Sequence, residues 1–333
     1  PYPQGQGIGV AVVDSGINPQ PDLAAASGQS RVTVSQVFNS GTNRTPQDGY
    51  GHGTHVAGII GGDGDLAAGA YLGVAPMVSL INVKVSDDNG SATLSSLLQG
   101  LQWILDNREA YNIRVVNLSL NSAVPEAYHA SPLDAAAEIL WFNKIVVVAA
   151  AGNIGKGPLY PPANDPFVIT VGATDDRGTP SIYDDRVASF SPSGVVPGRI
   201  FKPDLVAPGV DIVAALPAND QTVLQGAHPD HQVGDSYFRM SGTSMAAPMV
   251  AGAVALLLQR EPNLTPDQVK YRLMATANRR WPAYSLRQAG AGILDVYGAL
   301  HTPTYESANL GRTPSHLLNT GSESIAWNSV NWN

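Results

Sequence analysis

The sequence of 333 residues contains no cysteine. A disulfide scaffold, a thiol nucleophile and a cysteine-based zinc site are therefore excluded. Charged residues are also few, at 14%, the formal net charge is −8, and no basic run is longer than Arg279–Arg280. This composition argues against a nucleic-acid partner. With 44% hydrophobic residues, the chain is predicted to be compact and globular.

Long hydrophobic runs are absent as well. The stretch Ala246–Leu258 carries no charge, but it is shorter than the roughly 20 residues that a membrane-spanning helix needs. We therefore expect a buried helix there and no membrane partner. No charged and then apolar leader follows Pro1, so we expect that a signal or pro-segment was removed or lies outside this sequence.

Short apolar, β-branched runs alternate along the chain with segments of helical pattern. Such alternation is typical of a parallel sheet with helices on both faces. We predict an α/β fold with a doubly wound, mostly parallel central sheet in a single large domain, residues 1–300, followed by a C-terminal extension, residues 301–333, of unknown role. The predicted strands are 8–13, 31–38, 78–85, 115–120, 145–151, 167–171 and 211–215, and the predicted helices include 93–107, 133–143 and 265–277.

Three polar residues stand at the ends of predicted elements. Asp14 follows the first strand, His52 opens a helix, and Ser244 opens the apolar helix. A serine hydroxyl needs a base to become a nucleophile, a histidine can take its proton near neutral pH, and a carboxylate can orient the imidazole. The order Asp, His, Ser disfavours an α/β-hydrolase, which has its serine first and a glycine where Ala246 stands.

An acyl-transfer site also needs hydrogen-bond donors for the developing oxyanion. The backbone N–H of Ser244 lies at a predicted helix N-terminus, where unpaired N–H groups and the helix dipole favour negative charge. Asn153 follows a buried strand in the segment Ala149–Gly155. Its side-chain amide is the second candidate donor.

Each of these residues also has a purely structural interpretation. Asp14 and Asn153 can stabilise turns, and Ser244 can be a helix N-cap. His52 and His55 stand three apart, as metal ligands can, but no third ligand is visible nearby. We therefore interpret His52 as the base and His55 as structural.

Four segments together resemble the signature segments of the subtilisin-like serine peptidases, the subtilases. They are Val12–Gly16, His52–Gly58, Ala150–Asn153 and Gly242–Pro248, in the family's order, and the resemblance covers roughly residues 8–300. It implies a subtilisin-like fold, a secreted serine endopeptidase without a catalytic cofactor, the catalytic triad Asp14, His52 and Ser244, and an oxyanion hole formed by Asn153 and the Ser244 N–H.

In this family an extended polypeptide substrate adds a strand between two edge segments. The resemblance places these segments at residues 89–93 and 117–121, and the walls of the first pocket at 119–122 and 150–153. The implied substrate-binding residues are Ser91, Ala92, Ser119, Leu120, Asn121, Ala150, Ala151 and Gly152. Asn121, Ser122 and Ala92 replace glycines that are common in relatives, so the cleft is narrowed or made more polar.

The resemblance raises two further expectations, a structural calcium and a removed pro-segment that acts as an inhibitor. Many relatives hold calcium in a loop after the catalytic histidine, and Asp22 matches a carboxylate of that site. The corresponding stretch here, residues 61–70, differs in length and composition. A rival interpretation is a catalytically silent subtilase fold that binds peptides. The presence of the complete triad and of Asn153 favours the enzyme.

Overall fold

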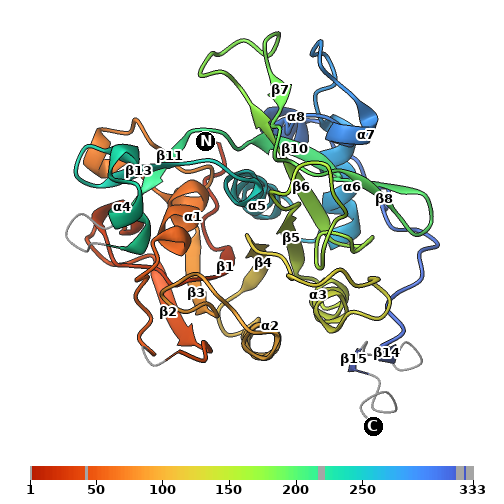
Figure 1. The fold of residues 1–333 in the computed structure, drawn as a ribbon, viewed down its shortest axis with the longest axis horizontal. Coiled ribbons are helices and arrows are strands. Elements are labelled where there is room, and N and C mark those ends of the chain that lie inside the picture. Colours follow the sequence, from red (N-terminus) through yellow and green to blue (C-terminus); the bar gives the residue numbers. More distant parts are fainter. Residues whose placement is uncertain (1, 42–43, 217–221, 320–325, 328–333) are drawn as a thin grey trace.

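An eight-stranded sheet lies at the centre of the computed structural model (Figure 1), which describes residues 2–41, 44–216, 222–319 and 326–327. The strand order is β10-β6-β5-β4-β1-β3-β2, with parallel pairing along this path, and β7 pairs with β6 in the antiparallel sense. The strands are β1 (Gly9–Asp14), β2 (Val32–Val37), β3 (Ser79–Lys84), β4 (Ile113–Leu118), β5 (Val146–Ala150), β6 (Ile169–Asp175), β7 (Arg186–Val187) and β10 (Leu205–Pro208). β1 and β5 are buried along their whole lengths, because a parallel sheet is covered on both faces.

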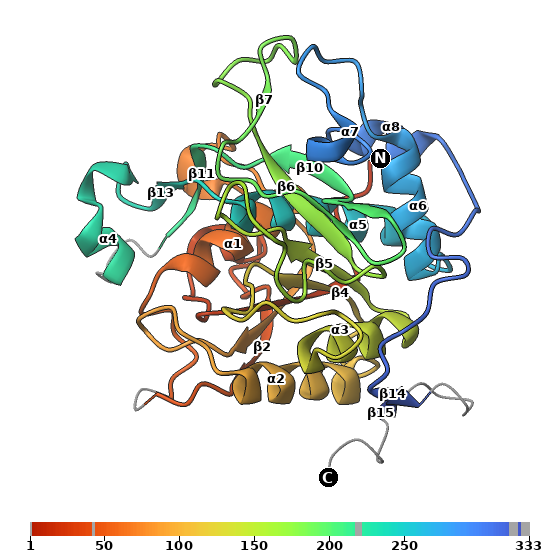
Figure 2. The same ribbon diagram turned by 45° about the vertical axis from the view of Figure 1, so that its right-hand side comes forward.

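Helices cover both faces of the sheet (Figures 1 and 2). α1 (His52–Gly61) and α5 (Thr243–Arg260) lie side by side on one face, and α2 (Leu94–Asn107) and α3 (Pro132–Phe142) lie on the other. The shorter or peripheral helices are α4 (Val223–Ala227), α6 (Pro266–Thr276), α7 (Leu286–Ala289) and α8 (Val296–His301), with 3-10 turns η1 (Pro21–Leu23), η2 (Asp65–Ala67) and η3 (Pro229–His231). Among the described residues, no helix combines the length and the apolar character that a membrane crossing requires.

One predicted strand lies outside the central sheet. β11 (Ile212–Ala215) forms close to its predicted position, but it pairs in the antiparallel sense with β13 (Tyr237–Met240), which also pairs with β12 (Gln232–Val233). The central sheet instead gains β10, which the sequence analysis did not predict, and a separate hairpin joins β8 (Gly194–Val196) to β9 (Ile200–Lys202). A short apolar run predicts a strand but not its partner.

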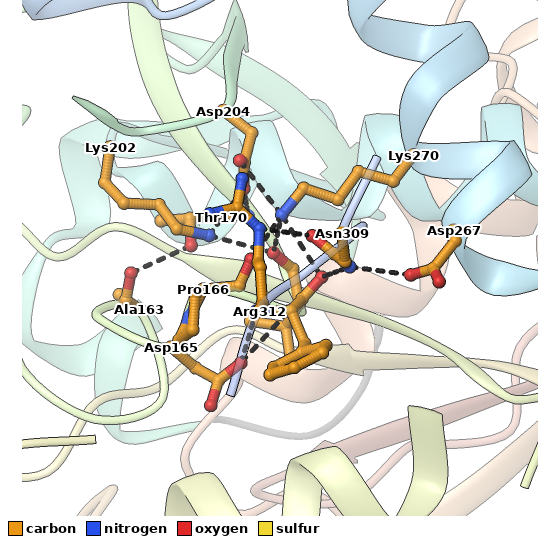
Figure 3. A network of polar contacts seen from close by, with 12 residues as sticks. Ala163, Asp165, Pro166, Thr170, Lys202, Asp204, Asp267, Lys270, Asn309 and Arg312 are labelled. Carbon is orange, nitrogen blue, oxygen red and sulfur yellow. Dashed lines mark hydrogen bonds and ion pairs between the residues drawn. The ribbon is translucent and has the colours of Figure 1, made fainter. Parts of the chain in front are cut away.

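A buried polar network joins α6 to the segment before β6 (Figure 3). The ammonium group of Lys270 donates to the carbonyl oxygens of residues 166–168 at 2.8, 3.1 and 3.0 Å, and it lies 3.1 Å from a carboxylate oxygen of Asp204. Lys202 donates to the Val168 carbonyl at 2.9 Å and to Asp204 at 2.7 Å. Buried charges are tolerated only when they are paired and hydrogen-bonded, and this network meets that condition.

The chain after α8 runs back over the main fold. The Asn309 amide donates to the Phe167 carbonyl at 3.0 Å and to Asp267 at 2.7 Å, and the Ser315 N–H donates to Glu138 at 2.7 Å. β14 (Leu318–Asn319) then pairs with β15 (Ala326–Trp327) in the antiparallel sense. The rest of the predicted extension, residues 320–325 and 328–333, lies outside the described residues. The described part is therefore bonded to α3 and α6, and a boundary at residue 300 stays a prediction.

Candidate active site

The carboxyl ends of three neighbouring strands, β5, β4 and β1, meet at one edge of the sheet. Asp14 is the last residue of β1, residues 119–121 follow β4, and residues 150–153 contain the end of β5 and the turn after it. In open parallel sheets, ligands and reacting groups gather at this edge. The first turns of α1 and α5 are hydrogen-bonded to the same three segments.

Asp14 and His52 are joined by a hydrogen bond. Nδ1–H of His52 donates to Oδ1 of Asp14 at 2.8 Å, and the backbone N–H of Ser15 donates to the same oxygen at 2.8 Å. Asp14 is only 5% exposed. Because the proton is on Nδ1, the Nε2 atom of His52 is left as the basic nitrogen.

The electrostatic surroundings make His52 a stronger base than a free histidine. Burial lowers its pKa, but the charge of Asp14 and the hydrogen bond to it act in the opposite direction, with a smaller contribution from Asp48. The net result is a pKa above the usual 6.5. A raised pKa favours the transfer of a proton from a hydroxyl group to this imidazole.

Asp48 supports this arrangement, and the sequence analysis missed it. Its buried carboxylate accepts hydrogen bonds from the N–H groups of Gly51 and Thr54, both at 2.7 Å, and so caps the first turn of α1. The Ser15 hydroxyl lies between two carboxylates, 2.8 Å from Asp48 and 3.1 Å from Asp14. Burial raises the pKa of Asp48. Asp48 thus fixes the start of the helix that carries His52.

His55 has a structural position. Its Nε2–H faces the carbonyl oxygens of Ile212 and Phe238 at 3.1 and 2.9 Å, which joins α1 to β11 and β13. Burial lowers its pKa to about 3, so the ring is neutral at physiological pH. Within the described ranges, no group of three or more histidine, aspartate or glutamate residues is arranged to hold a metal ion.

Ser244 lies in the first turn of α5 and is held by Ser119. The Ser244 hydroxyl donates to the Ser119 carbonyl at 3.1 Å, and the Ser119 hydroxyl donates to the Ser244 carbonyl at 2.9 Å. The second bond has a local cause, because Pro248 has no N–H to offer the carbonyl four residues earlier. To hydrogen-bond to His52, the Ser244 hydroxyl must rotate away from the Ser119 carbonyl.

Asn153 is anchored to the same helix start through its side-chain oxygen. The N–H of Thr243 donates to this oxygen at 2.9 Å, and the Thr243 hydroxyl lies 3.1 Å from it. The oxygen is thus committed, which leaves the amide NH₂ group as the donor of this side chain. The N–H of Ser244 belongs to the first turn of α5, whose N–H groups have no acceptor within the helix. Both predicted oxyanion donors therefore lie at the N-terminus of α5.

The predicted substrate-binding residues fall into two groups. Residues 119–121 and 150–152 lie beside the first turn of α5. Ser119 is bonded to Ser244, and the Thr243 hydroxyl donates to the Gly152 carbonyl at 3.0 Å. Ser91 and Ala92 lie in an exposed turn near α1. Gly90 of this turn lies against Tyr50, where an added Cβ atom would meet the ring at 2.7 Å. The two groups thus lie beside different helix starts.

At the place where calcium was considered, the Asp22 carboxylate is already hydrogen-bonded. Oδ1 of Asp22 accepts the N–H of Leu66 at 2.9 Å, and Oδ2 accepts the hydroxyl of Tyr237. The positive charge there is the guanidinium group of Arg31, which donates to the Asp22 carbonyl at 2.7 Å and lies 3.9 Å from Asp63. Calcium needs six to eight oxygen ligands. Both carboxylate oxygens of Asp22, the residue expected to bind calcium, are committed to protein donors instead.

Comparisons with known proteins agree with the fold. The model of the subtilase family matches residues 5–292. Serine protease AprX of Bacillus subtilis is 39% identical over 299 residues, which cover 88% of this chain and 66% of AprX. Subtilisin Savinase of Lederbergia lenta is 38% identical over 273 residues, 82% of this chain and 84% of that protein. The chain thus spans about two thirds of the length of AprX. It belongs to the subtilase family, the subtilisin-like serine proteases.

Proposed function

We propose that this protein is a secreted serine endopeptidase that cleaves polypeptides through an acyl-enzyme on Ser244. The observation that carries the proposal is the hydrogen bond from His52 to buried Asp14, which leaves Nε2 as the basic nitrogen of the ring. The family relationship supports the reaction class. Secretion is inferred from the family resemblance alone.

The proposed mechanism uses groups of this chain and one water molecule. His52 Nε2 takes the Ser244 proton as the hydroxyl oxygen attacks the substrate carbonyl carbon, and Asp14 stabilises the imidazolium. The negative oxygen is held by the Asn153 amide and the Ser244 N–H. His52 then gives its proton to the leaving amine, which breaks the peptide bond. In the second half, a water molecule loses a proton to His52 and attacks the acyl-enzyme. His52 then returns this proton to the Ser244 oxygen as the ester bond breaks and the acid is released.

The proposed substrate is an extended polypeptide that pairs with the backbone of residues 89–93 and 117–121. The substrate-binding residues are those implied by the family resemblance, and a removed pro-segment that binds as an inhibitor is part of the same proposal. Calcium has no part in the chemistry. A structural calcium would be supported by a melting temperature that falls when a chelator is added.

The test is hydrolysis of casein by the parent protein and by Ser244→Ala, with Ser241→Ala as the matched control. The Ser241 hydroxyl accepts the N–H of Asp211 at 2.9 Å and is exposed. We expect Ser244→Ala to lose activity and Ser241→Ala to keep it, with both variants folded by circular dichroism. Undiminished hydrolysis by Ser244→Ala would refute the assignment. A parent protein that binds peptides but never cleaves them would favour the silent subtilase fold.

A further inference from the structure

Two chain segments border the space next to Ser244. Residues 119–121 are joined to the first turn of α5 by the Ser244–Ser119 bonds, and residues 150–153 by the Thr243 bonds to Gly152 and Asn153. A substrate carbonyl carbon on Ser244 with its oxygen at the Asn153 amide has its own Cα only about 1.5 Å further on. The side chain of that substrate residue must therefore enter between these two segments.

The side chain of Asn121 spans this space. Its Nδ2 donates to the Ala150 carbonyl at 2.9 Å. Its Oδ1 faces Gly152, where a Cβ atom would lie 3.3 Å away. Gly152 has a φ of +108°, a backbone conformation that side chains other than glycine rarely adopt. The amide of Asn121 therefore joins one wall to the other.

We propose that Asn121 closes the first substrate pocket and restricts the residue on the acyl side of the cleaved bond to small side chains such as alanine, serine and glycine. This inference rests on the proposed function. A large side chain must displace the Asn121 amide from between the walls. That displacement leaves the Ala150 carbonyl without its donor, and a buried polar group that loses its partner is costly. A small side chain leaves the bond intact.

The test is hydrolysis of the peptides Ala-Ala-Pro-X-p-nitroanilide, with X either alanine or phenylalanine. For the parent we expect kcat/KM to be at least about tenfold higher for alanine, in the range that pocket size supplies. Asn121→Gly removes the bridge, so phenylalanine should become the better substrate, mainly through a lower KM. Asn121→Ala should shift the ratio in the same direction and serves if the glycine variant folds poorly.

The matched control is Asn143→Gly. The Asn143 side chain also donates from Nδ2 to a main-chain carbonyl, that of Ile139 at 2.8 Å, but it lies at the end of α3. Its variant should keep the parent's alanine-to-phenylalanine ratio.

The outcomes separate the two proposals. If the parent cleaves neither peptide nor casein, the proposed function fails. If the parent cleaves but prefers phenylalanine, or if both Asn121 variants keep the parent ratio, the inference about Asn121 fails while the proposed function stands.

Discussion

The polar side chains of the site differ in which of their hydrogen bonds are already committed. Oδ1 of Asp14 and the side-chain oxygen of Asn153 are both engaged by neighbouring groups. Among the described residues, no hydrogen bond engages Nε2 of His52 or the Asn153 amide NH₂. Such preorganisation lowers the reorganisation needed when charge develops. We therefore expect the reaction rate to fall strongly when a substitution removes one of these available groups.

Asn153→Ala removes one oxyanion donor. We expect kcat to fall by about 10²–10³-fold, the loss typical of a single such donor, with little change in KM, because the donor acts on charge that develops in the transition state. Steady-state kinetics on a peptide p-nitroanilide gives both constants. An unchanged kcat with a raised KM would show that Asn153 only binds substrate.

Asp48→Asn tests the electrostatics around His52. Activity requires neutral His52, so kcat/KM should rise with pH through a pKa above 6.5 in the parent. Removing the Asp48 charge removes one contribution to that raised pKa, so the acidic limb should move to lower pH. The measurement is kcat/KM against pH, with the exposed Asp106→Asn as control. Superimposable limbs in all three proteins would contradict this account.

Sequence alone singled out Asp14, His52, Ser244 and Asn153, because each carries chemistry at the end of a predicted element. Asp48 was missed, because an aspartate before glycine is typical of a turn. Its position just before a predicted helix was the available signal, since carboxylates favour helix N-termini. Its link to Asp14 through the Ser15 hydroxyl depends on the fold.

At the scale of elements, the Lys270 side chain of α6 donates hydrogen bonds to three main-chain carbonyls that lie before β6. Lys270→Met keeps most of the side-chain stem but removes the donor for the carbonyls of residues 166–168 and a counter-charge of Asp204. Burial lowers the pKa of Lys270 to about 7, so the prediction rests on its hydrogen bonds. Each buried carbonyl left without a donor costs about 1–3 kcal/mol, and the free energy of unfolding should fall accordingly. Urea denaturation measures it, with the exposed Lys156→Met as control. Equal stability of the two variants would contradict the prediction.

α3 carries a second buried contact, between two carboxyl groups. Oε1 of Glu138 and Oδ2 of Asp165 are buried and find no N–H or O–H donor in the described part of the chain. The two carboxyl groups interact electrostatically. Burial and the nearby Asp165 charge raise the pKa of Glu138 to about 10. Glu138 is therefore protonated in the folded protein at neutral pH.

The raised pKa of Glu138 makes the stability of the folded protein depend on pH. The unfolded chain ionises Glu138 near 4.5 and the folded protein only near 10. Protonated Glu138 therefore makes its full contribution to the stability of the folded protein below about pH 4.5. This contribution is lost as the pH rises toward about 10. Glu138→Gln keeps an acceptor for the Ser315 N–H and should make the melting temperature fall less steeply between about pH 5 and pH 9. The exposed Glu109→Gln should follow the parent, and parallel curves for all three would contradict the raised pKa of Glu138.

The elements were predictable to different degrees. Local patterns located β1, α2 and α5, because apolar periodicity and cap residues are written in neighbouring residues. The antiparallel partner of β11 was not predictable in this way, since pairing depends on how distant segments meet. The turn at residues 150–153 was expected near the site, but the bond from Asn121 to the Ala150 carbonyl emerged only from the structure.

At the scale of the whole molecule, the segment after α8 is part of the packing. Leu318 lies in a cluster with Ala135 and Ile139 of α3, and Asn309 contacts α6 through Asp267. The sequence analysis described this segment as an appended extension, because its Ser-, Asn- and Thr-rich composition gives no apolar periodicity. Its hydrogen bonds come largely from single polar groups, which a periodicity analysis does not detect.

The central claim is that folding makes Ser244 the nucleophile. The most direct measurement is reaction with a serine-directed sulfonyl fluoride, followed by intact mass and peptide mapping, in the parent and in Ser244→Ala. We predict one adduct per molecule of parent, on the peptide that contains Ser244, in step with loss of hydrolysis, and none in the variant. Inactivation with the adduct on another residue, or hydrolysis that persists in the fully labelled protein, would contradict the account.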